Sequence, residues 1–550
     1  MAKTVIVGAV AAGMSAATRL RRLDEAAEIV VFEAGGHVSF ANCGLPYYVG
    51  GVIPERDSLL LQTPEGLHSR FALDVRVHSR VTAIDPAAKT VTVATPDGSS
   101  YVETYDSLVL SPGAQPIVPD LPGAERALTL RNIEDVDRMA DAVVGATSAV
   151  VIGAGFVGLE VAENLAHRGL AVTVVELAPQ VLGALDAELA VRVRDALEAN
   201  GITVHTSART TSIDASTAHI VTDDGLEIDV PADVVVAAIG VRPDSSLARD
   251  AGLDLGPAGS IVTDEDGRTS AVDIYAVGDV AAKRDSLDGS VRLIPLANLA
   301  NRHGRRVADA IVGLPSRGRP SVGTAIVTVF GTVAAMTGRG ERDLRASGRD
   351  VRVIHTHPMS HAGYYPGAEQ MTIKLLVDPA TDAILGAQAV GGEGVDKRID
   401  VIATAMAGGL TASELADLEL AYAPPFGSAK DAVNMLGYVA ENLADSLTPS
   451  VQWHELATMN NALLVDVRTP AEHALGSVDG AVNIPLDDLR GRQDELPFGT
   501  TIVVHCQVGQ RGHTATRLLR QLGFDAVNLD GGWLTWRDGT RSQAALAVTQ

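Results

Sequence analysis

The sequence predicts an α/β protein of several domains, in which one strand–turn–helix–strand plan occurs twice in the N-terminal half. Three observations support this prediction. The chain has 550 residues, enough for several domains. It contains 54 glycines, as many tight turns between strands and helices require, and 46% of its residues are apolar, which is ample for complete cores.

The first unit of this plan begins at residue 3. The segment KTVIVGAVAAGMSAATRL predicts a buried strand, a turn and a helix, and the next strand, EIVVFEAG, ends in Glu33. A signal peptide is the alternative interpretation, but Gly8 and Gly13 lie where a nucleotide-binding turn needs them. Val10 stands at the position of the middle glycine, so this fingerprint is weak by itself.

The second unit carries the complete fingerprint. In AVVIGAGFVGLEVAENLAHRG, Gly153, Gly155 and Gly158 let the backbone approach a pyrophosphate at a helix N-terminus. The following strand, AVTVVELA, ends in Glu176, which can bind a ribose hydroxyl and repels a 2′-phosphate. We therefore expect NADH as the cofactor of this unit, with NADPH as the alternative; a capping or solvated role for Glu176 is the other interpretation.

Three further segments extend the pattern to a family. IYAVGDVA places Asp279 after a buried strand, and YDSLVLSPGAQP and DVVVAAIGVRPD resemble the two crossings between FAD and NAD domains. Together these segments resemble the two-dinucleotide-binding flavoproteins, which implies FAD on the first unit, with Asp279 at the flavin ribityl chain, and nicotinamide on the second. The cofactor-binding residues implied are Gly8, Gly13, Glu33, Val81, Gly113, Asp279, Ala297, Phe426, Gly153, Gly155, Gly158, Glu176 and Gly240.

The chain has two cysteines, Cys43 and Cys506, far apart in the sequence. A secreted protein stapled by disulfides normally carries more, so we expect a reducing compartment, a cytoplasmic location and cysteines kept for chemistry. Cys43 has no second cysteine nearby, yet its thiolate can attack a disulfide or persulfide sulfur. An inert buried cysteine is the alternative.

The stretch around Cys43, SFANCGLPYYVG, resembles the active site of coenzyme A disulfide reductases and their persulfide-reducing relatives. The resemblance implies that Cys43 is catalytic and that coenzyme A binds as a substrate or as a tethered arm. Arginines on one helical face suit the phosphates of such a ligand, although a solvated face is the other interpretation. The substrate-binding residues implied are Ser15, Arg19, Arg22, Ser39, Asn42, Asn301 and Lys430.

A dimerisation domain is the third expectation from this family. HAGYYPGA and YAPPFGSAKDAVNMLGY resemble segments that reach across a homodimer toward the partner's Cys43. Tyr364 and Tyr365 are candidates for donating a proton to a leaving thiolate, and we favour Tyr365. Phe426 stands where disulfide reductases often have tyrosine, which puts an acid role at that position in doubt.

The segment HTHPMSH contains His355, His357 and His361 at a spacing that could hold a metal. No carboxylate or cysteine completes the set nearby in the sequence, and the segment aligns with the dimerisation domain. We expect no metal site.

A C-terminal domain carries the second cysteine. After the linker NLADSLTPSVQ, the segments LLVDVRTP, HALGSVDGAVNIPLDDL, IVVHCQVGQRGHTATRLLRQLGF and DGGWLTW resemble a single rhodanese domain. The loop CQVGQR follows a buried strand and precedes a helix, which favours a thiolate at Cys506 beside Arg511. Phosphatase loops have one more residue between Cys and Arg. Asp466 and Arg468 are expected to orient the loop, and His473 to pack; a merely regulatory domain is the alternative.

These expectations give four domains: an FAD domain (1–115 and 242–322), an NAD(P)H domain (116–241), a dimerisation domain (323–445) and a rhodanese domain (452–540). The implied function is NADH-dependent reduction of a CoA persulfide, polysulfide or CoA disulfide, with release of hydrogen sulfide or thiol, and a sulfane-sulfur donor at Cys506. The residues do not rank these substrates or glutathione persulfide.

Two other functions compete with this one. An NADH oxidase or peroxidase with a redox-sensing rhodanese domain is the alternative, but related peroxidases carry a histidine where this chain has Val10. A sulfur carrier with a vestigial flavin half is the other, and the intact Cys43 loop argues against it. The charge balance, 44 basic against 68 acidic residues, and the lack of an uncharged apolar run of roughly 18 residues argue against nucleic-acid and membrane partners.

Overall fold

The computed structural model of the protein describes residues 2–315 and 317–547. Every sheet named below lies in one of two compact units, each with its own buried cores. The first unit comprises Met1–Val175, Thr210–Ile220 and Ile228–Gly323, and the second comprises Glu176–Arg209, Val221–Glu227 and Thr324–Gln550.

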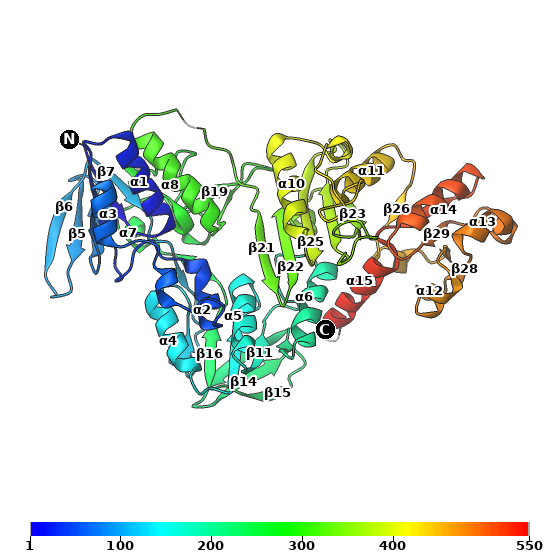
Figure 1. Cartoon of the computed structure of the whole chain (residues 1–550), viewed down its shortest axis with the longest axis horizontal. Coiled ribbons are helices and arrows are strands. Elements are labelled where there is room, and N and C mark those ends of the chain that lie inside the picture. The colour runs from blue at the N-terminus through cyan, green and yellow to red at the C-terminus, as the bar shows by residue number, and fades with distance from the viewer. Residues whose placement is uncertain (1, 316, 548–550) are drawn as a thin grey trace. The chain divides into compact units, whose positions relative to one another are not determined.

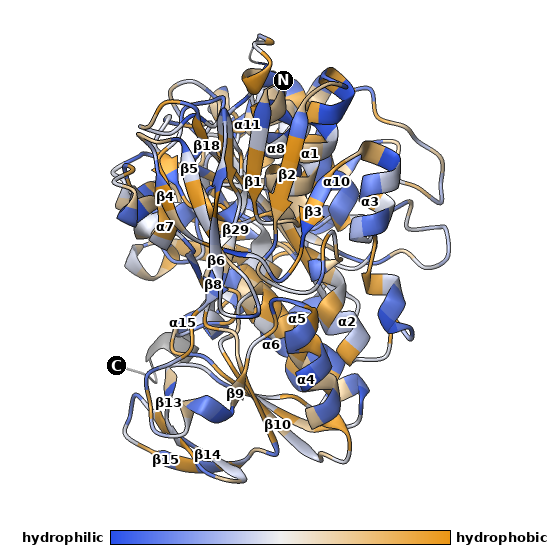
Figure 2. Cartoon of the chain, turned by 90° about the vertical axis from the view of Figure 1, so that its left-hand side faces the viewer, coloured by the Kyte–Doolittle hydropathy of each residue, from blue (hydrophilic) through white to orange (hydrophobic). Residues whose placement is uncertain are grey.

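The first unit is centred on a five-stranded parallel sheet of order β18-β7-β1-β2-β3. Its inner strands read as continuous apolar runs because both faces are covered, and Figure 2 shows β1 and β2 in the hydrophobic colour. Helices α1 and α8 lie side by side (Figure 1), and a Cβ on Gly304 would lie 2.2 Å from the Ala12 carbonyl. The bounds are β1 Lys3–Val7, α1 Ala11–Leu23, β2 Glu28–Phe32, β3 Asp74–Arg76, β7 Ser107–Leu110, β18 Ile274–Ala276 and α8 Ala297–Ile311.

Smaller elements of the first unit surround this sheet. Strands β4, β5 and β6 form an antiparallel sheet, and β8 pairs with β17, so the two predicted crossing segments lie side by side. The bounds are α2 Leu45–Val49, α3 Pro64–Phe71, β4 Arg80–Asp85, β5 Thr90–Ala94, β6 Ser100–Thr104, β8 Ala114–Pro116, β17 Val241–Pro243, α7 Ser246–Asp250, β19 Lys283–Arg284 and β20 Val291–Arg292.

The second predicted nucleotide-binding region also contains a parallel sheet, which lies in the first compact unit. In this sheet the strands β11, β10, β16 and β9 are neighbours in that order. All five residues of β10 are buried, as expected of a central strand. The bounds are β9 Ala127–Leu128, α4 Ile133–Val143, β10 Ser148–Ile152, α5 Phe156–His167, β11 Ala171–Val175 and β16 Val234–Ala237. The elements that follow β11 are α6 Ala187–Ala199, β12 Thr203–His205, β13 Ala208–Ile213, β14 Thr217–Thr222 and β15 Glu227–Pro231.

An antiparallel sheet of order β21-β22-β25-β24-β23 lies in the second unit. Helices α10 and α11 cover one face, where Ile373 and Leu375 of β24 pack with Ile399 and Ile402 of α10 (Figure 1). The bounds are β21 Ala325–Val329, β22 Thr332–Gly338, α9 Glu341–Ala346, β23 Arg352–Thr356, β24 Thr372–Val377, β25 Ile384–Gly391, α10 Val395–Gly408 and α11 Ala432–Ala444.

The C-terminal part of the second unit is a five-stranded parallel sheet of order β26-β30-β29-β27-β28. The predicted α/β class therefore holds for this part as well. Its bounds are β26 Ser450–Val451, β27 Leu463–Asp466, α12 Pro470–Ala474, β28 Val482–Asn483, α13 Leu486–Arg492, β29 Ile502–His505, α14 Gln510–Gln521, β30 Ala526–Leu529 and α15 Gly532–Ala547. Within the part of the chain that the structure describes, no helix combines the length and apolarity needed to cross a membrane.

Candidate active sites

The first glycine turn is tightly constrained. Gly8 has φ +99°, and a Cβ there would lie 2.2 Å from the Ser111 carbonyl oxygen; a Cβ on Gly13 would lie 2.0 Å from the carbonyl oxygen of Gly8. Glu33 closes the turn, because its carboxylate accepts from the backbone N–H of Ala9 at 2.9 Å and of Gly35 at 2.8 Å. The weak first fingerprint thus folds as a tight turn between β1 and α1 despite Val10, which precedes α1 as its N-cap.

Asp279 meets the requirement for holding a polar ligand. It lies in the turn after β18, and its Oδ1 is buried without a hydrogen-bond partner among the described residues. Burial raises the pKa of its carboxyl, against the influence of Lys283 and Arg131. A buried orphan acceptor requires a donor. The ribityl hydroxyls of FAD are donors of this kind, so the first unit fits the flavin.

The second glycine turn leaves room for a ligand. A Cβ on Gly153 would lie 2.5 Å from the Ala238 carbonyl oxygen, and one on Gly158 would lie 2.1 Å from that of Gly153. A Cβ on Gly155, the N-cap of α5, would meet no atom within 4 Å. The outer glycines serve packing, whereas the middle one faces open space at a helix N-terminus, as binding of a pyrophosphate requires.

The remaining predicted cofactor residues differ in their surroundings. Gly113 and Gly240 have φ of +76° and +113°, where glycine is favoured, at the crossings formed by β8 and β17. Val81 is buried in a core cluster, and Ala297 is exposed at the start of α8. Glu176 accepts from the backbone N–H of Ala178 at 2.7 Å.

Cys43 lies at the surface of the first unit, in a short 3₁₀ turn, Asn42–Gly44, directly before α2. Partial desolvation raises the pKa of its thiol, and the negative charges of Glu160 and Asp279 raise it further. Tyr47 of α2 donates to Glu160 Oε1 at 3.3 Å, and burial raises the pKa of Tyr47 to about 12. Sequence reasoning missed Glu160, because it comes from α5, over a hundred residues away.

Several predicted substrate residues lie in the same unit. Ser15 of α1 donates to Asn301 Oδ1 of α8 at 2.6 Å, so the structure brings these two together. The N–H of Ser39 donates to the Ala9 carbonyl at 2.9 Å, and Asn42 Nδ2 donates to the Arg131 carbonyl at 3.3 Å.

The two predicted arginines of α1 have unequal environments. Arg22 is exposed, whereas Arg19 Nε lies 2.7 Å from Asp309 Oδ1. Arg19 is therefore already paired with a carboxylate, which the expectation of two phosphate-binding arginines did not include.

The predicted aromatic segments of the second unit present their rings to solvent. Tyr365 is 43% exposed and contacts the His361 ring edge-on, and the Tyr364 hydroxyl lies 3.1 Å from that of Tyr422. Phe426 is 71% exposed, and Lys430 is exposed as well. Exposed aromatic side chains on consecutive segments are typical of a surface that another chain covers.

The three histidines of HTHPMSH are all buried and have different partners. His357 contacts the hydroxyls of Thr372 and Thr535 at 2.9 and 2.8 Å, whereas His361 Nδ1 contacts the neighbouring carbonyl. His355 lies between two carboxylates that the sequence pattern did not indicate. Those carboxylates belong to Glu188 and Asp530, which are distant in the sequence.

Among the described residues, one group of side chains has the spacing of a metal site: the carboxylates of Asp186, Glu188 and Glu341. The ammonium of Lys374 lies 2.9, 2.6 and 2.7 Å from their oxygens, respectively. A lysine thus supplies the positive charge, and the cluster is an ion-pair network.

The loop that carries Cys506 is held from two sides. Cys506 is fully buried at the end of β29, and its carbonyl accepts from the Trp533 N–H at 2.8 Å. Gly532 has φ +62°, and a Cβ there would lie 2.5 Å from that same carbonyl oxygen. The sequence DGGW is therefore required for a close approach of two backbones.

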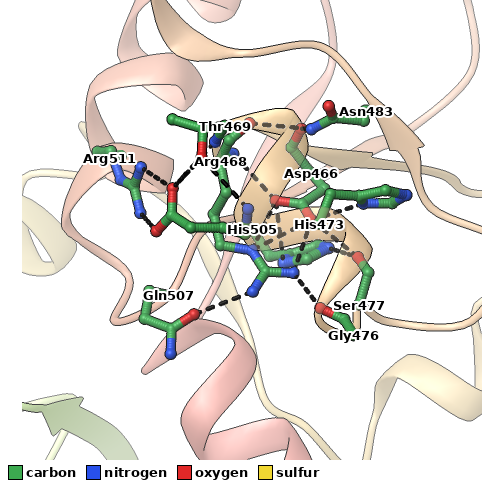
Figure 3. A network of polar contacts seen from close by, with 11 residues as sticks. Asp466, Arg468, Thr469, His473, Gly476, Ser477, Asn483, His505, Gln507 and Arg511 are labelled. Carbon is green, nitrogen blue, oxygen red and sulfur yellow. Dashed lines mark hydrogen bonds and ion pairs between the residues drawn. The ribbon is translucent and has the colours of Figure 1, made fainter.

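A buried polar network supports the same loop (Figure 3). Arg468 donates from Nε to both oxygens of Asp466, at 3.0 and 3.1 Å, and from Nη1 to Gln507 Oε1 at 2.9 Å. Asp466 and Arg468 are therefore connected to the loop through Gln507, as their expected orienting role requires. His473 was expected only to pack, but its Nδ1 lies 2.9 Å from Asp466 Oδ2.

His505 was not anticipated either. It directly precedes Cys506, its Nε2 lies 3.3 Å from Ser477 Oγ, and burial lowers its pKa to about 4. Arg511, the predicted partner of Cys506, forms a two-pronged ion pair with Glu472.

Two glycine turns, an exposed cysteine and a rhodanese-type loop define the class: an oxidoreductase of the FAD- and NAD(P)H-binding fold joined to a rhodanese domain. The family "Pyridine nucleotide-disulphide oxidoreductase" matches residues 2–304, its dimerisation domain matches 324–433, and the rhodanese-like domain matches 450–538. The chain belongs to this family, in the branch of the coenzyme A disulfide reductases.

Individual relatives agree with this assignment. Coenzyme A disulfide reductase of Staphylococcus aureus (strain JH9) is 35% identical over 448 residues, which cover 80% of this chain and all of that one. The crystal structure of reduced Bacillus anthracis CoADR-RHD has 44% identity and a TM-score of 0.95 over 98% of both chains. A NAD-dependent persulfide reductase from A. fulgidus has 38% identity and a TM-score of 0.89, over 97% of this chain and 100% of that one. The predicted fold class and family are confirmed.

Proposed function

We propose that the protein uses NADH and bound FAD to reduce a CoA-type persulfide, polysulfide or disulfide through Cys43, releasing hydrogen sulfide or thiol. One observation carries the proposal: Cys43 is exposed, and the only other cysteine of the sequence, Cys506, is buried in another domain. A thiol with no second cysteine near it in the sequence cannot store an electron pair as one half of a dithiol–disulfide couple. The oxidised sulfur that it meets must therefore come from the substrate.

The chemistry of Cys43 balances for a persulfide R–S–SH. Attack of the thiolate on the inner sulfur expels hydrosulfide and leaves a mixed disulfide; attack on the outer sulfur expels R–S⁻ and leaves a persulfide on Cys43. FAD, when bound, would supply the electron pair that returns either adduct to a thiol, after taking a hydride from NADH. In sum, R–S–SH, NADH and one proton give R–SH, hydrogen sulfide and NAD⁺.

Binding of the CoA arm is assigned to the residues around α1 and the Cys43 turn. The Ser15–Asn301 pair, Ser39 and Asn42 offer hydroxyl and amide groups, and exposed Arg22 offers a guanidinium for phosphate. Tyr365 is proposed as the donor to the leaving thiolate and Lys430 as a phosphate partner, both contributed across a homodimer. NADH is preferred over NADPH because Glu176 places a carboxylate at the end of β11.

The rhodanese domain is proposed to accept sulfane sulfur on Cys506 and to hand it to CoA at Cys43. The support is the loop itself: a thiol at the N-terminal end of the twelve-residue helix α14, with Arg511 beside it. Joining both sites in one chain makes the handover intramolecular and raises the effective concentration of the sulfur carrier.

The decisive test is anaerobic NADH oxidation with CoA persulfide, with hydrogen sulfide counted, in the wild type and in Cys43→Ser. We expect one sulfide per NADH in the wild type and none in the variant. Rapid NADH loss only after air enters, without sulfide, would favour the oxidase instead. Cys506→Ser should retain CoA persulfide reduction and lose sulfide release that starts from the sulfane-sulfur donor.

A further inference from the structure

Glu472 is anchored in a fixed position beside the Cys506 loop. It is the third residue of α12, where it forms a capping box: the N–H and hydroxyl of Thr469 donate to Glu472 Oε2 at 3.0 and 2.9 Å, and the N–H of Glu472 donates to Thr469 Oγ1 at 3.3 Å. The sequence TPAE therefore sets the carboxylate by local structure. The same carboxylate also meets a partner across the loop.

That partner is Arg511, the last residue of CQVGQR. Nη1 and Nη2 of Arg511 donate to Oε2 and Oε1 of Glu472 at 2.9 and 2.6 Å, the bidentate geometry in which guanidinium and carboxylate pair best. Arg511 lowers the pKa of Glu472 to about 2, while Glu472 chiefly, and Cys506 in addition, raise the pKa of Arg511. The cation beside the thiol is thus neutralised by a carboxylate that stays ionised.

The second arginine at the loop is committed in the same way. Arg468 is buried and pairs with Asp466, whose pKa is held far below its usual range by Arg468 and the neighbouring histidines against the effect of burial. Between Cys506 and Arg511 the loop contributes four uncharged residues, QVGQ. The described residues therefore give the loop two guanidinium groups and two carboxylates, and no net positive charge.

We propose that Glu472 determines the donor specificity of Cys506 by excluding thiosulfate and leaving organic persulfides as sulfur donors; this rests on the proposed sulfurtransferase role. Thiosulfate carries two charges, and its sulfonate oxygens need uncompensated cationic donors once they leave water. A persulfide R–S–SH presents only its small sulfur end to the buried thiol. A loop without net positive charge accepts the second donor and disfavours the first.

The transfer step needs no additional reactant. The Cys506 thiolate attacks the outer sulfur of R–S–SH, a new S–S bond forms, and the old S–S bond breaks with its electron pair leaving on R–S⁻. The outer sulfur keeps its proton, so that the products are Cys506–S–SH and a thiolate. The oxidation state of the transferred sulfur is conserved.

The test is Glu472→Gln in the full chain with Cys43→Ala, so that Cys506 is the one remaining thiol. Glutamine keeps an oxygen for the Thr469 donors and removes the charge that faces Arg511. Loading of Cys506 is followed by the mass of one added sulfur atom, with thiosulfate or glutathione persulfide as donor. Glu495→Gln is the matched control, because Glu495 pairs with Arg492 at 2.7 and 2.8 Å on the exposed surface of the same domain.

We expect the wild-type loop to load from glutathione persulfide at least about tenfold faster than from thiosulfate, and Glu472→Gln to raise the thiosulfate rate about tenfold, the value of one charge-assisted hydrogen bond. The persulfide rate should change by less than about twofold, which also shows that the variant is folded. Glu495→Gln should change neither rate. Gln510→Lys, which adds a cation to the loop without touching the capping box, should also favour thiosulfate.

Two results would overturn the proposal in different ways. Equal loading from both donors in the wild type, or an unchanged ratio in both Glu472→Gln and Gln510→Lys, would refute the role of Glu472 while leaving Cys506 a sulfur acceptor. Failure of Cys506 to load from either donor would instead refute the sulfurtransferase function, and the specificity proposal with it.

Discussion

Nδ1 of His355 lies 2.7 Å from Oδ2 of Asp530, and the backbone N–H of His355 donates to the same oxygen at 3.0 Å. On the other side of the ring, Nε2 lies 3.1 Å from Glu188 Oε1. Asp530 directly precedes the two glycines whose backbone meets the Cys506 loop. A buried histidine of β23 is thus fixed to the segment that supports the rhodanese loop.

Because of His355, we expect the protein to lose stability at alkaline pH. Burial lowers its pKa, but Asp530 and Glu188 outweigh that effect and raise the pKa to about 9. A pKa above the unfolded value of roughly 6.5 gives stability that is fully present below pH ~6.5 and lost as pH rises through ~9. We expect the urea midpoint of the second unit to fall as pH rises through this window. The variant His355→Gln should have a lower urea midpoint than the wild type at pH 6, and its midpoint should change little across the same window.

His219→Gln is the control for that experiment. His219 also lies between two carboxylates, Asp214 and Asp229, at 2.9 and 2.6 Å, but these carboxylates are exposed. Solvent screens such pairs, so this change should leave the pH profile of stability as it is. An equal effect of both substitutions would contradict the role given to the buried pair.

Lys374→Met should destabilise the second unit. The lysine is 1% exposed and is the cation that the three carboxylates of Asp186, Glu188 and Glu341 share. Removing one side of a buried ion pair costs about 3–5 kcal/mol, because the other charges stay buried. Chemical denaturation would measure this loss; Lys89→Met, in an exposed pair with Asp273, should change stability little.

The same variant offers a second readout. With the ammonium gone, three carboxylates face one another within the distance of a metal site. Millimolar Ca²⁺ should then restore part of the lost thermal stability of Lys374→Met and leave the wild type unchanged, because oxygen ligands suit a hard cation. Absence of any Ca²⁺ effect would show that the carboxylates separate or protonate when Lys374 is lost.

The sequence predicts those features that local patterns encode. The glycines of both turns, the buried strands beside them and the CQVGQR loop follow from spacing and periodicity within a few residues, and the family confirms their fold. Val10 weakened the first fingerprint without changing its structure, because Gly8 and Gly13 are the positions where a Cβ would clash.

Partners brought together by the fold escaped prediction. Glu160 beside Cys43, and Glu188 and Asp530 around His355, come from elements more than a hundred residues apart, and nothing in their local sequence marks them. Glu472 is an intermediate case. The sequence TPAE indicates a capping box, but only the fold shows that the Glu472 carboxylate also pairs with Arg511. Whether the charges of a loop are neutralised depends on tertiary contacts, which the local sequence does not show.

Glu160→Gln should make Cys43 more reactive. Desolvation raises the pKa of the Cys43 thiol first, and the charge of Glu160 adds to that effect. Glutamine removes the charge and keeps an acceptor for Tyr47, so the thiol pKa should fall and the pH profile of alkylation should move to lower pH. The rate of iodoacetamide labelling against pH, in a Cys506→Ala background, measures the change.

An unchanged or raised midpoint in Glu160→Gln would contradict this assignment. Glu198→Gln is a suitable control, because Glu198 forms an exposed ion pair with Arg194 on α6. That substitution removes one negative charge from the chain without removing one from the surroundings of Cys43, and the labelling profile should stay in place.

Asp279→Leu should separate cofactor binding from the stability of the protein itself. The buried Oδ1 of Asp279 has no hydrogen-bond partner among the described residues, and burial raises the pKa of its carboxyl. Without FAD, this group has a desolvation cost that Lys283 and Arg131 offset only in part, so the flavin-free variant should melt at the same temperature as the wild type or higher. With FAD, the loss of a charged acceptor should weaken binding by about ten- to a hundredfold.

Both arms are measured by thermal melting with and without added FAD, together with the flavin absorbance retained per chain after gel filtration. A fall in FAD affinity with unchanged or increased stability of the flavin-free protein assigns Asp279 to the ligand. A fall in both would mean that the carboxylate, through Lys283 and Arg131, supports the fold of its turn instead, because removing a structural charge would then expose two unpaired cations to the same buried site.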